Sequence, residues 1–149
     1  MDPKVCYMTH EPADCVCMNL RKAGRLMAQF YDQRLQPSGL RTTQFTLLAT
    51  LQNLAPVSIT NLSDHMGMDR TTLTRNVKPL EKDKLIASQA GEDARVRLLV
   101  LTARGETALS EARPYWESAQ SDFLKRFGLD RWGALRGELT DINGVVSTA

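Results

Sequence analysis

The stretch from residue 58 to residue 102 constrains the fold of this chain more than any other part of the sequence. A short helix is expected over residues 61–66, and Gly67 directly after it suits the left-handed backbone that often ends a helix. Asp69 is placed to cap a second helix, because its carboxylate can accept hydrogen bonds from free backbone N–H groups. Two helices joined by a short glycine-containing turn are typical of a helix-turn-helix.

The second helix is expected to run over about residues 70–84. Two strand-like segments follow it, 85–88 and 97–102, around a turn over 91–94, and this pattern predicts a β-hairpin. The whole layout predicts a winged helix-turn-helix, whose first helix braces the second and frees its polar face for a major groove about 12 Å wide. The buried face of the second helix would consist of Leu73, Val77 and Leu80.

Positive charge is concentrated in this middle part of the chain. Residues 69–104 hold eight basic and five acidic side chains, a net charge of +3, whereas residues 105–149 hold five basic and seven acidic ones, a net charge of −2. A basic middle suits DNA binding, although charge alone would equally fit a mixed solvated surface. The expected DNA-binding side chains are Arg70, Thr71, Thr72, Thr74, Arg75, Asn76 and Lys78 on the helix and Asp93, Arg95 and Arg97 in the hairpin.

The hairpin would supply a contact of its own. Arg95 lies in or beside its turn, from where a guanidinium group can enter a narrow minor groove. Asp93 lies two residues earlier and is placed to hold an arginine through a bidentate pair. Helix and hairpin together therefore predict a protein that binds duplex DNA.

The flanking segments are expected to form further helices. One is expected over residues 14–35 with Asp14 as its cap, and others over 42–53, 103–127 and 130–146. The sequence thus predicts a mainly α fold with a small β-hairpin wing. The apolar face of the first helix, which we expect to be buried, would consist of Val16, Leu20, Ala23, Met27, Phe30 and Leu35.

The length of the chain fits one domain over residues 1–149. Within it, residues 36–104 would form the DNA-binding lobe and residues 1–13 an N-terminal arm. The helices in 14–35 and 105–147 carry apolar stripes that need a partner, so we assign them to dimerisation. The sequence has neither an export signal nor an apolar run near the roughly 18 residues of a membrane span, which predicts a cytoplasmic protein without membrane contact.

Several motifs resemble the MarR family of transcription regulators. They are the stretch from Leu62 to Arg75, the run over residues 80–86, and Asp93-Ala94-Arg95 followed by Leu101-Thr102-Ala103-Arg104-Gly105, which resembles the wing signature D-x-R with L-T-x-x-G. The chain departs from the family at Lys84, where many relatives have glycine. It also departs at Pro79, which should kink or shorten the helix.

The resemblance implies a homodimer with two-fold symmetry that binds a pseudo-palindromic operator in double-stranded DNA. By the same resemblance, residues 70–76 would face the major groove and Arg95 the minor groove, and repression would be the usual effect. A small-molecule or oxidative signal would release the repressor, and the sequence leaves the chemistry of that signal open.

An oxidant acting on cysteine would be one such signal. If Asp14 caps the first helix, Cys15 and Cys17 lie in its first turn, where free N–H groups and the helix dipole favour a thiolate. Cys15 resembles in position the reactive cysteine of a peroxide-sensing branch of the family. Cysteine is, however, more often a small buried apolar residue, and Cys17 lies near the Leu20, Met27 and Tyr31 side of the helix.

A metal ion or a phenolic ligand would also fit as the signal. Cys6, His10, Cys15 and Cys17 are four ligand types suited to zinc or copper(I). Side chains two residues apart on a helix point about 200° apart, however, so the main expectation is no metal and no other cofactor. By the resemblance to the family, a small phenolic effector would contact Met27, Phe30, Tyr31 and Phe45, although residues at this helical spacing more often belong to a plain core.

Two different functional classes fit the sequence less well. An enzyme is not expected, because neither histidine belongs to a nucleophile–carboxylate constellation and no phosphate-binding or metalloprotease motif is present. A winged-helix adaptor that binds proteins instead of DNA is the nearer alternative. It would have no reason to place positive charge on both the helix and the wing, as Arg70, Thr74, Arg75, Lys78 and Arg95 do.

Overall fold

The computed structural model describes residues 12–93 and 95–147, and these form a mainly helical protein with one small sheet. Residues 1–11 of the expected N-terminal arm lie outside this range, and with them Cys6 and His10 of the expected metal set. In chain order the elements are η2 (Pro12–Asp14), α1 (Val16–Leu35), η3 (Gln36–Ser38), α2 (Thr42–Leu54), β1 (Val57–Ser58), α3 (Ile59–Met66), α4 (Arg70–Lys82), β2 (Ile86–Ala90), β3 (Arg97–Leu101), α5 (Ala103–Phe127) and α6 (Leu129–Ser147).

The expected helix-turn-helix is present as α3 and α4. Gly67 follows α3 with a φ of 62°, and its N–H donates to the carbonyl of Asp64 while the N–H of Met68 donates to Ser63. This pair of bonds satisfies the last carbonyls of the helix and turns the chain sharply toward α4. Helix α3 begins two residues earlier than expected, because the Ser58 hydroxyl caps it by accepting from the N–H of Asn61 at 3.2 Å.

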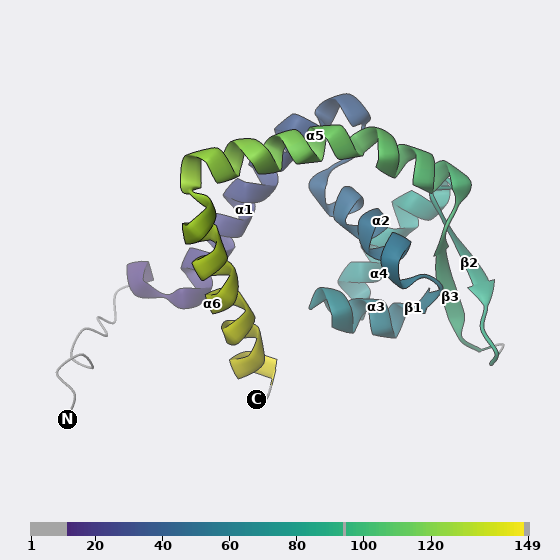
Figure 1. Cartoon of the computed structure of the whole chain (residues 1–149). Coiled ribbons are helices and arrows are strands. Elements are labelled where there is room, and N and C mark those ends of the chain that lie inside the picture. Colours follow the sequence, from purple (N-terminus) through teal and green to yellow (C-terminus); the bar gives the residue numbers. More distant parts are fainter. Residues whose placement is uncertain (1–11, 94, 148–149) are drawn as a thin grey trace.

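The wing is a three-stranded antiparallel sheet in the order β1-β3-β2. In the hairpin, Ile86 pairs with Leu101 and Ala90 with Arg97, whereas β1 covers the other edge of β3 through Val57 and Leu99. Strand β2 extends two residues further than predicted. Because β1 precedes α3 directly, the sheet is joined to both ends of the helix-turn-helix (Figure 1).

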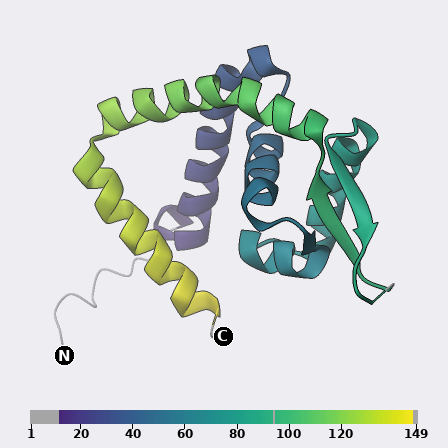
Figure 2. The same ribbon diagram turned by 45° about the vertical axis from the view of Figure 1, so that its right-hand side comes forward.

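The apolar core lies in the lobe formed by α2, α3, α4, the sheet and the first part of α5. The expected face of α4 is buried, and Leu62 of α3, Leu48 and Leu51 of α2 and Leu109 of α5 are all fully buried with it. Helix α5 leaves the lobe and crosses the molecule, and α6 turns away from its far end (Figures 1 and 2). In both views α6 stands apart from the lobe.

The apolar face predicted for α1 is not buried along its whole length. Leu35 at the end of the helix is fully buried, but Val16 at its start is 65% exposed, and Leu20 and Leu26 are also exposed. The apolar spacing correctly predicted a helix, but the start of its apolar face is not covered by other described segments of the same chain. Helix α6 likewise contains no buried residue.

Helix α1 also begins differently from the prediction. Asp14 does not cap it, because Pro12 starts a short 3-10 turn that already contains Asp14. Cys15 takes the cap position instead, without a side-chain hydrogen bond to the helix. The two cysteines nevertheless stay together at the start of α1.

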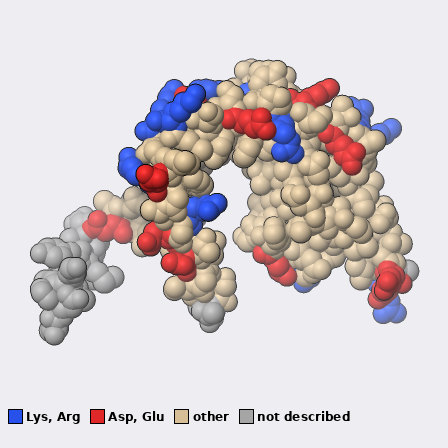
Figure 3. Space-filling model, viewed as in Figure 1, with Lys and Arg blue, Asp and Glu red and all other residues tan. Residues whose placement is uncertain are grey.

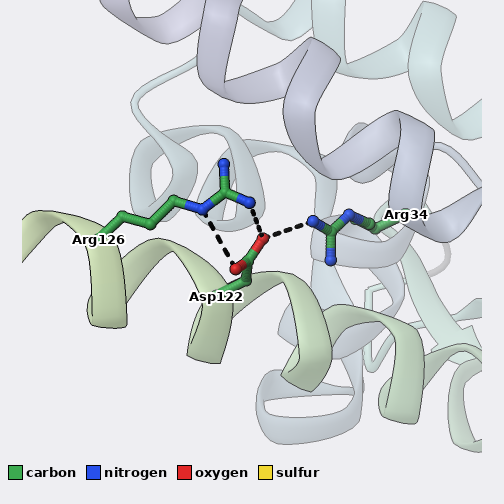
Figure 4. Close-up of polar contacts among 3 residues, drawn as sticks. All are labelled: Arg34, Asp122 and Arg126. Atoms are coloured by element: carbon green, nitrogen blue, oxygen red, sulfur yellow. Dashed lines mark hydrogen bonds and ion pairs between the residues drawn. The ribbon is translucent and has the colours of Figure 1, made fainter.

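Ion pairs and hydrogen bonds between polar side chains connect α1 to α5 where the two helices cross. Arg34 of α1 and Arg126 of α5 both bind the carboxylate of Asp122, with Arg126 Nη2 at 3.0 Å (Figure 4). Partial desolvation would raise the pKa of Asp122, but the hydrogen bonds and positive charges of the two arginines outweigh it and lower the pKa. The hydroxyl of Tyr31 donates to Gln120 nearby, and burial raises the pKa of this tyrosine.

Candidate nucleic-acid interface

Helix α4 presents its polar side chains opposite the core. Arg70, Thr71, Arg75 and Lys78 are exposed, whereas Leu73, Val77 and Leu80 on the other side are buried. None of these three basic side chains forms an ion pair with a carboxylate in the described part of the chain. Three positive charges without internal partners on one helix face are suited to phosphate binding.

The beginning of α4 is held by Asp69. Its carboxylate accepts from the Thr72 backbone N–H at 2.8 Å and from the Thr72 hydroxyl at 2.6 Å. These bonds to the side chain and backbone of Thr72 lower the pKa of Asp69. Because the pKa of Asp69 is lowered in the folded protein, its carboxylate stabilises the fold fully above the ordinary carboxyl pKa. This stabilisation of the fold is lost as the pH falls through the lowered pKa.

The short polar side chains of α4 therefore differ in whether they already form a hydrogen bond within the protein. The hydroxyl of Thr72 is engaged by Asp69, and the hydroxyl of Thr74 donates to the carbonyl of Arg70 at 2.7 Å. The side chains of Thr71 and Asn76 have no hydrogen bond within the described ranges. Of the predicted short donors, Thr71 is thus both exposed and uncommitted, whereas Asn76 is half-buried.

The turn of the wing is organised by Asp93, but not in the way that the sequence suggested. The Asp93 carboxylate accepts from the Arg95 backbone N–H at 2.9 Å, and the Asp93 carbonyl accepts from the N–H of Val96 at 2.8 Å. The expected pair with an arginine side chain is absent among the described residues. Asp93 shapes the turn, and the Arg95 side chain is left exposed for an outside partner.

Arg97 has a different environment from Arg95. Its Nη2 lies 3.8 Å from Glu81 Oε1 on α4, and the Ser88 hydroxyl of β2 donates to the same oxygen at 2.5 Å. Glu81 therefore joins both strands of the hairpin to α4. Arg97 begins β3 at the turn end of the wing, opposite Ala90, and although 73% of its side chain is exposed, it has a partner within the protein.

The L-T-x-x-G part of the wing motif forms the junction between the sheet and α5. The Thr102 hydroxyl accepts from the Gly105 N–H at 3.0 Å and donates to the carbonyl of Lys84 at 2.7 Å. Gly105 is buried directly against Leu85, and a Cβ atom at this position would lie 2.1 Å from the Leu85 carbonyl oxygen. The motif thus fixes where α5 leaves the lobe.

Helix α4 continues through Pro79 and ends at Lys82, two residues before the predicted end. Lys84 follows with a φ of 60°, and its N–H donates to Glu81 while the N–H of Leu85 donates to Leu80. Glycine adopts this left-handed backbone at no steric cost, whereas a residue with a Cβ does so at a cost of about 1 kcal/mol. The departure from glycine noted in the sequence is therefore a point of strain.

Lys84→Gly is expected to raise the free energy of unfolding by about 0.5 kcal/mol, because relief of the left-handed strain exceeds the added chain entropy of glycine. Urea unfolding followed by circular dichroism measures the change. Lys78→Gly is the matched control in the interior of α4, and it should lower the free energy of unfolding by about 1 kcal/mol. Equal losses in both variants would contradict the assignment of strain to Lys84.

The residues expected to bind an effector are divided between two places. Phe45 lines a cavity of about 400 Å³ between α2, α3 and α5, where it stacks on Trp116 with ring centroids 5.6 Å apart. Phe30 and Tyr31 contact each other edge to face on α1, and neither they nor Met27 line this cavity. Sequence reasoning missed His65 and Trp116, which no periodic pattern links to Phe45. The walls of the cavity include Phe45, Ala49, Asn53, Leu54, His65 and Trp116.

Cys15 and Cys17 are free thiols, and both are exposed. In the single chain they are therefore not small buried apolar residues. No group of three or more histidine, cysteine or acidic side chains is placed to hold a metal within the described ranges, but two members of the expected set lie outside them. Among the same residues, no helix has the length and hydropathy required to cross a bilayer.

Comparison with known proteins shows which regulators this chain resembles. The MarR family profile matches residues 40–96. The chain is 34% identical to the transcriptional regulator MosR of Mycobacterium tuberculosis, solved in complex with DNA, with a TM-score of 0.82 over 91% of this chain and 98% of that one. It is also 29% identical over 108 residues to YwoH, an uncharacterised HTH-type transcriptional regulator of Bacillus subtilis, which covers 72% of this chain and 79% of that protein.

A probable transcriptional regulator from Pseudomonas aeruginosa has the same fold, with 26% identity and a TM-score of 0.78 over 89% of this chain and 99% of that one. The family is one of transcription regulators rather than enzymes. The matched segment contains α2 to α4 and the hairpin turn, and the structural match extends through the helices on both sides. The chain belongs to the MarR family of DNA-binding, winged helix-turn-helix transcription regulators.

Proposed function

We propose that the protein acts as a homodimeric repressor in which two copies of α4 enter successive major grooves of a pseudo-palindromic operator. The observation that carries this proposal is the set of basic side chains on α4 and on the wing that have no ion-pair partner in the part of the chain that the structure describes. Arg70, Arg75 and Lys78 on α4 and Arg95 on the wing have no ion-pair partner among the described residues. Their charges are available to the phosphates and base edges of DNA.

The dimer is supported by the apolar side chains that one chain leaves uncovered. Val16, Leu20 and Leu26 on α1 and Leu129 and Leu135 on α6 are large, apolar and exposed. Contiguous exposed apolar surface marks an interaction site more often than a solvated face. Figure 3 shows a hollow between α6 and the lobe. In this view, the part of the lobe that borders the hollow carries few charged side chains. A second copy of α1 and α6 suits such a surface.

A mobility-shift titration against the DNA upstream of the protein's own gene tests the proposal. We expect one specific complex with the mass of a dimer on one site, and lower transcription from that fragment when the protein is present. A specific complex of monomer mass would overturn the dimer. Higher transcription would overturn the repressor. Failure to bind any fragment would favour the adaptor.

The releasing signal is proposed to be an oxidant or a small phenolic ligand. Exposure of Cys15 and Cys17 supports the oxidant, and the cavity beside Trp116 supports the ligand. The titration is therefore repeated after mild peroxide treatment, with Cys15→Ser and Cys17→Ser in parallel. Release that a serine variant abolishes identifies a thiol switch. Release by a phenol such as salicylate, but not by peroxide, identifies the ligand mode.

Arg95→Ala is expected to weaken operator binding about tenfold, because it removes the guanidinium proposed to enter the minor groove. The matched control is Arg97→Ala, two residues along the same hairpin. Arg97 already has Glu81 as its partner, so its loss should cost less affinity. Equal affinities for Arg95→Ala and the unaltered protein in the mobility-shift titration would exclude Arg95 from the interface.

A further inference from the structure

We infer that Arg41, at the start of α2, binds a DNA phosphate beside the groove that α4 enters. The inference rests on the proposed function and extends the DNA-binding surface to a helix for which the sequence predicted no DNA contact. Arg41 and Arg75 line one recess of about 130 Å³ between α2 and α4. The remaining walls of the recess come from Thr43, Gln44, Asn76 and Pro79.

The electrostatics of this recess favour an anion. Arg41 and Arg75 are both exposed, and no carboxylate within the described ranges lies at ion-pair distance from either guanidinium group. Asp32, the acid that reaches the start of α2, is engaged with the backbone N–H of Thr42 at 2.6 Å. Two like charges that share a recess without a counter-ion are stabilised by a bound phosphate.

The backbone of Arg41 is held in place on both sides. Its N–H donates to Gln44 Oε1 and its carbonyl accepts from the N–H of Phe45, each at 2.9 Å. Phe45 is buried in the lobe, so the attachment point of the Arg41 side chain is fixed relative to α4. A fixed starting point reduces the entropy lost when a long side chain binds.

The size of the major groove indicates which part of DNA this recess meets. A helix with its side chains is about 10–12 Å across, and the groove is about 12 Å wide, so α4 alone fills it. An element that lies beside α4 therefore meets the wall of the groove, which is the sugar–phosphate backbone. Arg41 would position the protein on DNA without reading its sequence.

Arg41→Gln separates this contact from the rest of the interface. We expect the slope of log affinity against log salt to fall by about one unit, with affinity reduced by the same factor, about three- to tenfold, for operator and random DNA. Arg41→Lys should restore the slope, because it restores the charge. Arg104→Gln, which removes an exposed charge from a different recess, lined also by Asp83 and Glu111, is the matched control and should leave affinity and slope unchanged.

Ethylation interference locates the contact directly. Ethylation of one phosphate per half-site should weaken binding of the unaltered protein but not of Arg41→Gln. An unchanged slope and affinity in Arg41→Gln would overturn the inference and leave the proposed function intact. A loss of sequence discrimination at constant slope would also overturn it, by placing Arg41 on a base. Failure of the unaltered protein to bind DNA would overturn the proposed function itself.

Discussion

Gly105→Ala is expected to lower the free energy of unfolding by about 3 kcal/mol or more, because the added methyl group would make closer contacts here than at any other glycine. The added Cβ atom would lie 2.1 Å from the Leu85 carbonyl oxygen and 2.8 Å from Leu101 Cδ1. The first of these atoms is backbone, so the clash cannot be relieved by turning a side chain. Either α5 or the segment after α4 must move, and the Thr102 cap is lost with it.

Urea unfolding at fixed protein concentration measures this loss. Gly137→Ala is the matched control, since its Cβ atom would have no neighbour within 4 Å in α6. We expect that control to be neutral or up to about 1 kcal/mol more stable, because alanine favours a helix more than glycine does. If Gly105→Ala unfolded at the same urea concentration as the control, the junction would not be the close contact described above.

Leu26→Asp is expected to weaken operator binding by about 100-fold or more, by preventing the two copies from associating. Leu26 is 56% exposed on α1, next to other apolar side chains of the same helix. A carboxylate placed in an apolar interface loses its water without gaining a partner. Two half-sites bound by linked copies hold the protein far more tightly than one half-site bound alone.

Analytical ultracentrifugation measures whether the two copies associate, and the mobility-shift titration measures operator affinity. We expect Leu26→Asp to sediment as a folded monomer with the circular dichroism spectrum of the unaltered protein. Leu26→Met keeps an apolar side chain of similar size and should remain dimeric with unchanged affinity. If Leu26→Asp remained a dimer at micromolar concentration, α1 would not contribute this face to the interface.

The DNA-binding helices and the wing were predictable because their signals are local. Gly67, Asp69 and the apolar spacing of α4 each act within a few residues of their position, and the structure confirms each of them. The predicted Asp14 cap was wrong because a neighbouring Pro12 changed the local geometry. The predicted pairing of Asp93 with an arginine side chain was wrong, because the carboxylate instead accepts from the backbone N–H of Arg95.

Features that depend on distant segments could not be read from the sequence. The role of Gly105 depends on the Leu85 carbonyl, twenty positions earlier, and that of Arg41 on its closeness to Arg75. The buried face predicted for α1 shows the same limit, since Val16 has the right spacing but no cover within one chain. Periodicity indicates that an apolar face will be covered, but it does not indicate which segment will cover it.

Helix α5 is a long rigid connection between the DNA-binding lobe and α6. It is anchored in the lobe at Gly105 and leads at its other end to α6, and its 25 residues span about 37 Å at 1.5 Å per residue. A rotation of about 5° at the far end would displace the lobe by about 3 Å over that length. Half-sites on DNA repeat at intervals of about 34 Å, so a displacement of this size takes α4 out of register with its groove. In the proposed dimer, a small change where α1 and α6 meet α5 would therefore lower the affinity for the operator without any change within the lobe.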